Sequence, residues 1–217
     1  EALTEAAIER TLLALAQCRR RIDRRRAARL RAVATEACRR AVNRTEFLDR
    51  ARSETGIDLE VISPEEEARL TLAGCLPLLR NGAEHTLLFD IGGGSTELVL
   101  LGPLGAGEAG AGETGAGEAD PVEAMASMPL GVVTLAERFR SELCDRDAYA
   151  EAVAEVSGML DDFPDCDRVE GLALRGELRM LGTSGTVTTL AGVHLGLPRY
   201  DRRMVDGIEL ECCAISA

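Results

Sequence analysis

The sequence predicts an α/β protein. Segments whose apolar residues are spaced three and four apart alternate along the chain with short aliphatic runs, which is the pattern of helices alternating with strands. Hydrophobic residues make up 46% of the chain, enough for a real core, but only 3% of the residues are aromatic and none is Trp. Such a core must be built from aliphatic layers, as in α/β proteins.

The first 82 residues contain three helical and two extended patterns. The third helix has the clearest start, because Ser63 suits the N-cap, Pro64 the first helical position, and Glu66 can close a capping box. We expect this helix to run to about Leu79. Gly56 should end the helix before it. The other elements predicted in this part are helices over residues 3–17 and 35–52 and strands over residues 30–34 and 59–62.

A change of composition after residue 82 predicts a domain boundary, with one domain over residues 1–82 and a second over residues 83–217. Residues 102–120 are rich in Gly and acidic residues, so we expect a disordered acidic insertion between two adjacent strands. The other predictions for the second domain are strands over residues 87–91, 97–101, 122–128 and 178–181 and helices over residues 131–140, 147–160 and from Thr186 to about Leu195.

The most informative segment is F-D-I-G-G-G-S-T-E-L-V-L-L, which predicts two strands joined by a tight glycine turn. Residues 92–94 lack side chains and can adopt angles closed to other residues, so their peptide N–H groups can approach an anion, and Ser95 and Thr96 would add hydroxyl donors. Asp90 and Glu97 flank the turn. A carboxylate beside a phosphate needs a cation between them, typically Mg²⁺. The acids favour a phosphate site over a plain flexible turn.

A second glycine and hydroxyl turn, G-T-S-G-T at 182–186, follows the last predicted strand. Strand ends are where open α/β sheets bind ligands, so this turn is a second candidate binding loop, although a plain tight turn suits it equally.

The composition argues against several other classes. No apolar run approaches about 20 residues, and no signal peptide is present, so we expect neither a membrane span nor a membrane partner. The seven Cys are scattered without a C-x-x-C pair, which favours reduced thiols in the cytoplasm over zinc ligands or disulfides. His85 and His194 show no signature of a partner for a catalytic thiol.

Charge is unevenly distributed along the chain. The net charge is −12, yet residues 1–52 hold 14 Arg and 7 acidic residues, a balance of +7. The arginines from Arg19 to Arg31 could steer a polyanion or simply form the solvated end of a helix, and both interpretations stay open. Nucleic acid is not expected as a partner, because no aromatic stacking residues are interleaved with these arginines.

Five motifs, taken together and in order, closely resemble the exopolyphosphatase and guanosine pentaphosphate phosphohydrolase (Ppx/GppA) family. They are V-A-T-E-A-C-R-R-A at 33–41, I-S-P-E-E-E-A-R-L at 62–70, F-D-I-G-G-G-S-T-E-L at 89–98, M-P-L-G at 128–131 and L-G-T-S-G-T at 181–186. The resemblance spans almost the whole chain.

The resemblance implies a two-lobed actin-like or sugar-kinase (ribonuclease H-like) fold with mixed sheets flanked by helices, and substrate and Mg²⁺ bound in the cleft between the lobes. Residues 1–82 would be the C-terminal part of the first lobe, and residues 83–217 the second lobe. Nothing before Ala34 resembles the acid-glycine phosphate loop with which members of the family begin. We therefore expect this chain to be part of a longer enzyme and to be inactive by itself.

The implied enzyme is a cytoplasmic, Mg²⁺-dependent hydrolase that works as a homodimer when complete. It would release terminal phosphate from inorganic polyphosphate or from guanosine pentaphosphate, a nucleotide of the stringent response. Attack by water on a phosphoanhydride needs no covalent nucleophile, because positioning and charge neutralisation supply most of the catalysis. If the arginines from Arg19 to Arg31 steer a polyanion, they favour polyphosphate as the substrate.

The resemblance also assigns roles to individual residues. Glu67 matches the catalytic base, Asp90 and Glu97 match the acids that hold Mg²⁺ or order the attacking water, and Arg39 matches an arginine that contacts substrate. Otherwise Glu67 would be an acid on a helix surface, as we expect for the neighbouring Glu65 and Glu66. The phosphate-binding residues implied by the two glycine motifs are Gly92, Gly93, Gly94, Ser95, Thr96, Gly182, Thr183, Ser184 and Gly185.

Two alternatives differ in what they predict. A sugar-kinase or ATPase-like phosphotransferase would share the glycine hairpin, but Glu67 in E-E-A-R-L argues against it. A non-catalytic sensor of polyphosphate or alarmone would use the same loops to bind a ligand without hydrolysing it, so Glu67→Gln would leave the affinity unchanged.

Overall fold

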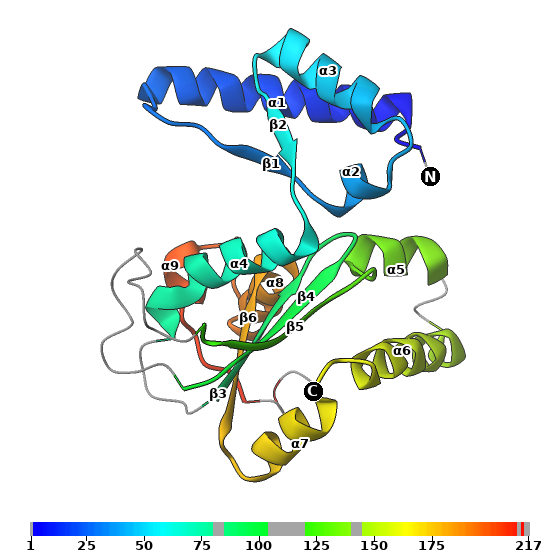
Figure 1. Ribbon diagram of the computed structural model, residues 1–217, viewed down its shortest axis with the longest axis vertical. Helices are drawn as coiled ribbons and strands as arrows, with labels where there is room; N and C mark the ends of the chain where they lie inside the picture. Colours follow the sequence, from blue (N-terminus) through cyan, green and yellow to red (C-terminus); the bar gives the residue numbers. More distant parts are fainter. Residues whose placement is uncertain (1, 80–84, 104–119, 140–144, 212–213, 215–217) are drawn as a thin grey trace. The chain divides into compact units, whose positions relative to one another are not determined.

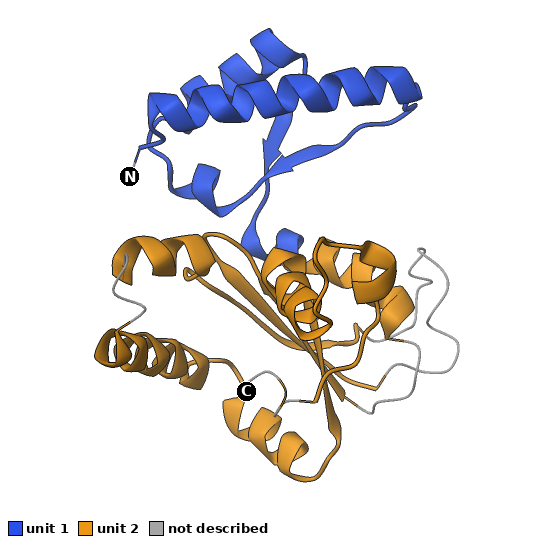
Figure 2. Ribbon diagram, turned by 180° about the vertical axis from the view of Figure 1, so that it is seen from behind, with its two compact units in different colours: residues 1–67 blue, residues 68–217 orange. Residues whose placement is uncertain are grey.

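The computed structural model covers residues 1–217 and describes residues 2–79, 85–103, 120–139, 145–211 and 214 (Figure 1). The chain forms two compact units, Glu1–Glu67 and Ala68–Ala217, which Figure 2 shows in blue and orange. The lobe boundary expected near residue 82 lies outside the described residues and stays a prediction.

The first unit packs helices against a parallel pair of short strands, in which Ala32 is opposite Leu59. Its core consists of the buried residues Ile8, Leu12, Cys38, Phe47 and Ala51. The elements of this unit are α1 (Glu5–Arg25), β1 (Ala32–Ala34), α2 (Glu36–Arg40), α3 (Arg44–Thr55), β2 (Leu59–Val61) and the start of α4 (Pro64–Cys75).

Two helices of the first unit differ from prediction. Helix α1 extends beyond residue 17 to Arg25, because Arg is a good helix former even where the apolar spacing has stopped. The single helix predicted over residues 35–52 is two helices. The backbone of Ala41 is extended, and the Asn43 side chain is held by Leu3, whose N–H donates to Asn43 Oδ1 at 2.8 Å and whose carbonyl accepts from Nδ2 at 3.0 Å. A distant contact therefore overrides the local helical pattern.

The start predicted for α4 is confirmed, since Ser63 Oγ accepts a hydrogen bond from the Glu66 N–H at 3.2 Å. The other hydrogen bond of the predicted capping box, from the Ser63 N–H to the Glu66 carboxylate, is absent. The Glu66 carboxylate pairs with Arg31, as the Glu60 carboxylate also does, instead of turning back to the N-cap. Helix α4 ends at Cys75 and a 3₁₀ turn over Leu76–Leu78 leads to Leu79, close to the predicted end.

The second unit is a mixed four-stranded sheet with helices on both faces (Figure 1). The strand order is β5-β4-β3-β6; β3, β4 and β5 are antiparallel neighbours, and β6 runs parallel to β3. The elements are β3 (His85–Ile91), β4 (Thr96–Leu101), β5 (Val122–Met128), α5 (Val132–Phe139), α6 (Arg146–Asp161), α7 (Cys166–Leu174), β6 (Leu178–Thr183), α8 (Ser184–His194) and α9 (Arg202–Val205).

Strand β4 is buried along its whole length, so its side chains supply both faces of the sheet. Val99 and Leu101 pack on α4, whereas Leu98 and Leu100 pack toward α6 and α7. This two-sided burial explains why β4 reads as a continuous apolar run after Glu97 instead of an alternating pattern.

The strands predicted in the second unit are all present, and β5 has the predicted bounds. Sequence reasoning missed α7 and α9. Most of the expected acidic insertion, residues 104–119, lies outside the described residues, but β4 and β5 on either side of it are paired and Gly102 N–H donates to Pro121 O at 2.9 Å. Among the described residues, no helix has the length and apolar character needed to cross a membrane.

Candidate active site

The glycine hairpin has the predicted form. In the β3–β4 ladder Asp90 is opposite Glu97 and Ile91 is opposite Thr96, and the Gly92 N–H donates to Ser95 O at 3.0 Å to close the turn. The expected reason for the glycines is wrong for Gly92 and Gly93, because neither has a φ in the left-handed region. Their lack of a side chain serves close packing instead.

A Cβ on Gly92 would lie 3.1 Å from Ser95 O, and one on Gly93 would lie 3.3 Å from Val133 Cγ2 of α5. The segment before α5 packs even more closely on the turn. A Cβ on Gly131 would lie 2.4 Å from the carbonyl carbon of Gly93 and 2.5 Å from the carbonyl oxygens of Gly92 and Gly93, far inside contact distance. Thr134 Oγ1 fixes Gly131 by accepting from its N–H at 2.8 Å and donating to its carbonyl at 2.9 Å. Gly131 is therefore the residue that lets α5 approach the hairpin turn.

The first N–H groups of α5 hold the peptides of the turn in one orientation. Val132 N–H donates to Gly92 O at 3.0 Å, and Val133 N–H donates to Gly93 O at 2.9 Å. In a trans peptide the N–H points opposite to the carbonyl. The N–H groups of Gly93 and Gly94 consequently point away from α5, side by side, as the donors of an anion-binding turn do.

Four polar residues form a row across the sheet beside this turn. Ser127, Glu97, Asp90 and Thr183 are successive partners in the register of β5, β4, β3 and β6. Each lies two residues along its strand from an apolar residue of the α4 core, so all four belong to the face of the sheet that α4 covers. The two glycine motifs thus meet, because Thr183 of the second is next to Asp90 of the first.

The two carboxylates in this row are held by hydroxyl groups that sequence reasoning missed. Ser127 Oγ donates to Glu97 Oε1 at 2.9 Å, and Thr71 Oγ1 of α4 donates to Asp90 Oδ2 at 3.2 Å. Neither residue carried a signal in the sequence, and in β5 the apolar residues Val122, Ala124, Ala126 and Met128 are in the opposite phase to Ser127. Glu97 is only 2% exposed.

This pair of acids fits Mg²⁺. Two carboxylates directly opposite each other on antiparallel strands repel unless a cation or proton compensates. Among the described residues no group of three or more His, Cys, Asp or Glu side chains forms a metal cluster. Mg²⁺ needs no such cage, because it commonly takes one or two carboxylates and completes its shell with water and phosphate oxygens.

The structure contradicts one predicted phosphate donor. Thr96 is buried, and its hydroxyl donates its only hydrogen to Leu130 O at 2.8 Å. It anchors the segment before α5 and has no hydrogen left for an anion. Ser95 is buried beside it at the end of the turn.

The second glycine motif is partly strand and partly helix. Gly182 and Thr183 end β6, and Ser184 begins α8, so the predicted turn is shorter than five residues. A Cβ on Gly182 would lie 2.5 Å from Phe89 Cζ, which explains this glycine by packing. Its predicted contact with phosphate gains no support from its position.

The start of α8 is strained and is tied to the hairpin. Ser184 has a φ of 77°, a left-handed conformation that costs energy for a residue with a side chain. Thr186 Oγ1 donates to Ile91 O at 3.1 Å, next to the glycine turn. A Cβ on Gly185 would meet no atom within 4 Å, so this first turn of α8 is open.

Cys75 of α4 packs beneath the polar row. Burial raises the pKa of its thiol, and a hydrogen bond with Thr183, which acts in the opposite direction, does not outweigh burial. Burial raises the pKa of Cys38 as well. Both shifts keep these two thiols protonated at neutral pH, which argues against Cys38 and Cys75 as nucleophiles.

In the first unit, Arg39 connects two acids with the backbone. Its Nε donates to Glu36 Oε2 at 3.0 Å, and its Nη1 donates to Glu67 Oε2 at 2.9 Å and to Ile62 O at 3.0 Å. Burial works against the charged guanidinium, but the hydrogen bonds with Glu67 and Glu36 prevail and raise the pKa of Arg39. Sequence reasoning selected Arg39 and Glu67 separately and missed Glu36.

The neighbouring acids of α4 have the surface roles expected for them. Glu66 pairs with Arg31, and the pKa of Glu65 is lowered because its carboxylate accepts hydrogen bonds from its own backbone N–H and from Ser63. Glu67 alone of the three pairs with Arg39. Within the arginine cluster, Arg19 pairs with Asp23 at 2.7 Å, and most of the others are exposed.

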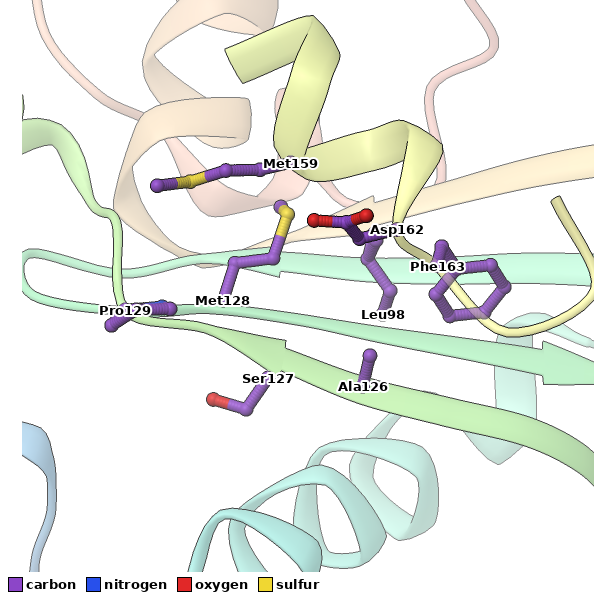
Figure 3. Close-up of a pocket in the computed structure, with 8 residues that line it drawn as sticks. All are labelled: Leu98, Ala126, Ser127, Met128, Pro129, Met159, Asp162 and Phe163. Carbon is purple, nitrogen blue, oxygen red and sulfur yellow. The ribbon is translucent and has the colours of Figure 1, made fainter. Parts of the chain in front are cut away.

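A cavity of about 300 Å³ in the second unit lies on the other face of the sheet from the polar row (Figure 3). Leu98, Met128, Met159 and Phe163 give it an apolar lining, and Asp162 is its charged residue. Figure 3 shows Met128 and Leu98 on the cavity side of the strands, with the Ser127 hydroxyl pointing away. This cavity does not suit a phosphate anion, because its lining is apolar and its charged residue is an acid.

These features define an α/β protein of the actin-like class, as predicted, with a mixed sheet covered by helices. The chain belongs to the Ppx/GppA phosphatase family, whose family model matches residues 1–203.

Individual relatives agree with this assignment. The chain is 29% identical over 194 residues to the guanosine-5'-triphosphate,3'-diphosphate pyrophosphatase of Photobacterium profundum, covering 89% of this chain and 35% of that protein. It is similar to the crystal structure of an exopolyphosphatase-like protein, with 31% identity and a TM-score of 0.73, over 94% of this chain and 60% of that one. The chain is also similar to the structure of the Aquifex aeolicus PPX-GPPA enzyme, with 28% identity and a TM-score of 0.61, over 94% of this chain and 59% of that one. The chain therefore spans about a third of the curated relative and three fifths of the solved structures.

Proposed function

We propose that the protein containing this chain is a hydrolase of terminal phosphoanhydride bonds, which releases phosphate from inorganic polyphosphate, guanosine pentaphosphate or both. The main support for this proposal is the polar row, in which Asp90 and Glu97 lie side by side next to the glycine hairpin. The N–H groups of Gly93 and Gly94 in that hairpin point away from α5. Amide donors beside paired acids suit a phosphate that is bound together with a cation.

In this proposal the hairpin binds the phosphate. The N–H groups of Gly93 and Gly94 donate to phosphate oxygens, with Gly92 completing the turn and Ser95 adding its hydroxyl. The N–H groups in the first turn of α8, at Ser184 and Gly185, are a second set of donors near the end of β3, and the helix dipole favours an anion there. These donors are fixed before the ligand binds, which is what phosphoryl transfer requires of a catalyst.

Asp90 and Glu97 would hold Mg²⁺. When bound, the ion neutralises negative charge on the transferring phosphoryl group. Thr71 and Ser127 orient the two carboxylates through one oxygen each. Thr183, adjacent to Asp90 in the sheet, contributes a further oxygen on the same face.

Glu67 is proposed as the base that takes a proton from the attacking water. Its carboxylate is 19% exposed and is held by Arg39, so it is fixed in one orientation instead of moving freely at the helix surface. Arg39 would bind a substrate oxygen through its remaining N–H groups, since its planar fork matches phosphate geometry. No covalent nucleophile is needed, in agreement with the protonated state of Cys75.

The substrate, the compartment and the assembly are also part of the proposal. The exposed arginines between Arg19 and Arg31 would favour a long polyanion such as polyphosphate. The relative from Photobacterium profundum carries the name of an enzyme acting on a guanosine nucleotide, which supports the pentaphosphate as a second substrate. We place the enzyme in the cytoplasm as a homodimer.

The test is Mg²⁺-dependent phosphate release by the full natural chain from polyphosphate, guanosine pentaphosphate and ATP. Glu67→Gln should abolish release, whereas Glu65→Gln, two residues earlier in the same helix, should retain it. Ligand binding with no release by the unmodified protein would favour a sensor. Transfer to a sugar instead of water would favour a phosphotransferase.

A further inference from the structure

The Arg39 guanidinium has a buried donor group without a partner. Of its five N–H bonds, the one on Nε binds Glu36, and the two on Nη1 match Glu67 and the carbonyl of Ile62. Nη2 is buried and has no hydrogen-bond partner among the described residues. A buried donor of a charged group is costly to leave unpaired, so such a group calls for a ligand.

The position of Nη2 depends on the other two nitrogens. A guanidinium is planar, so fixing two of its nitrogens fixes the third. Nη1 alone would leave the plane free to turn about its hydrogen bonds. The bond from Nε to Glu36 removes that freedom, and both side chains are only 15% exposed.

We propose that Glu36 is a positioning residue, which orients Arg39 so that Nη2 binds an oxygen of the substrate phosphate while Nη1 holds Glu67. This inference rests on the proposed function. It adds a residue outside the proposed set of substrate, metal and catalytic groups, and it makes α2 the element that sets the angle of the arginine fork. The ligand at Nη2 is an oxyanion, because a cationic planar donor pairs best with phosphate or carboxylate oxygens.

A plain structural role for Glu36 makes a different prediction. Glu36 is the first residue of α2, where the helix dipole and a negatively charged side chain stabilise each other. Such an effect would not involve Arg39. Glu36 Oε1 is also 4.0 Å from Arg40 Nε, so Arg40 provides a matched control for the loss of a nearby charge on the same helix.

The kinetic test uses the full natural chain and polyphosphate, with a double-mutant cycle between Glu36 and Arg39. Glu36→Ala should lower kcat/KM about 10-fold, the size expected for a hydrogen bond with a charged group, while Glu36→Gln should lose less because its carbonyl can still accept from Nε. In the Arg39→Lys background, Glu36→Ala should cause no further loss. Arg40→Gln should leave kcat/KM within about twofold.

The second readout does not depend on activity. The Nε–Hε signal of Arg39 in ¹⁵N NMR should exchange slowly with water in the unmodified protein and in Arg40→Gln, and should be lost in Glu36→Ala. Inorganic phosphate should shift that signal. Independent losses in the double-mutant cycle, or an Arg39 signal unchanged in Glu36→Ala, would overturn the inference. If the unmodified protein releases no phosphate, the proposed function fails and the NMR result alone decides the role of Glu36.

Discussion

Arg39 Nη1 and Glu67 Oε2 are 2.9 Å apart in an ion pair whose side chains are 15% and 19% exposed. The two residues are separated by 28 positions in the sequence and come from α2 and α4. The pair places the proposed base and the proposed substrate arginine in one hydrogen-bonded unit. A change to either should therefore affect the other, which isolated surface charges would not do.

Replacement of Arg39 by Lys should lower kcat/KM by roughly 10- to 100-fold, equivalent to about 1.5–3 kcal/mol for a hydrogen bond to a charged group. Lys retains the charge but has no planar fork to bind Glu67, Ile62 O and a phosphate together. Phosphate release from polyphosphate measures the effect. Arg40→Lys is the control, and an equal loss in both variants would refute a special role for Arg39.

The acids of the polar row should govern the dependence on Mg²⁺. Asp90→Asn and Glu97→Gln should each raise the Mg²⁺ concentration needed for half-maximal phosphate release by at least about 10-fold. Ser127→Ala should raise it roughly 10-fold, because residues that orient metal ligands typically contribute that much to affinity.

A matched control for the metal prediction is Ser157→Ala, which removes an exposed hydroxyl from α6. It should leave the Mg²⁺ titration unchanged. Chelation with EDTA should stop release and added Mg²⁺ should restore it. Full activity in EDTA, or normal Mg²⁺ dependence in both Asp90→Asn and Glu97→Gln, would show that these acids do not hold a metal.

Gly131 should be far less tolerant of a side chain than a glycine in open space. Gly131→Ala forces a Cβ into the Gly93 peptide and should destabilise the protein by about 1–3 kcal/mol, the usual cost of overpacking. Gly158 is within α6 and a Cβ there meets nothing within 4 Å, so Gly158→Ala should stabilise by about 0.5–1 kcal/mol. Thermal melts of the two variants should shift in opposite directions. A Gly131→Ala protein as stable as the unmodified one would contradict the close packing.

The buried thiols should resist alkylation at neutral pH. The pKa values of Cys38 and Cys75 are raised, so the reactive thiolate becomes populated only as the pH rises above the ordinary range for a thiol. Iodoacetamide at pH 7 should modify the exposed Cys18 before the buried Cys38 and Cys75, and the rates at Cys38 and Cys75 should increase with pH. Peptide mapping by mass spectrometry gives the order. Rapid labelling of Cys75 at pH 7 would argue against its burial.

The elements that were predicted well are those whose signal is local. Strand β5 and the hairpin strands follow from aliphatic runs bounded by Gly and Pro, and the start of α4 follows from Ser63 and Pro64. The break between α2 and α3 could not be predicted, because it depends on Asn43 reaching the backbone of Leu3, 40 residues away.

The candidate site likewise contains some residues that the local sequence predicts and others that only the fold brings into place. Asp90, Glu97 and the glycine turn were visible because they are contiguous in the sequence. The partners Thr71, Ser127 and Glu36 were not, since each acts through a contact 3 to 30 residues distant that only the fold creates. Thr96 was assigned wrongly because its type suits an anion donor, whereas its hydroxyl is already used by Leu130 O.

The most direct measurement is Mg²⁺-dependent phosphate release from polyphosphate and guanosine pentaphosphate by the full natural chain, with Glu67→Gln and Glu65→Gln assayed alongside. We expect release by the unmodified protein and by Glu65→Gln, and a loss of several orders of magnitude in Glu67→Gln with substrate still bound. Release that survives in Glu67→Gln would contradict the assignment of the base. No release from either substrate by the unmodified protein would contradict the proposed hydrolase.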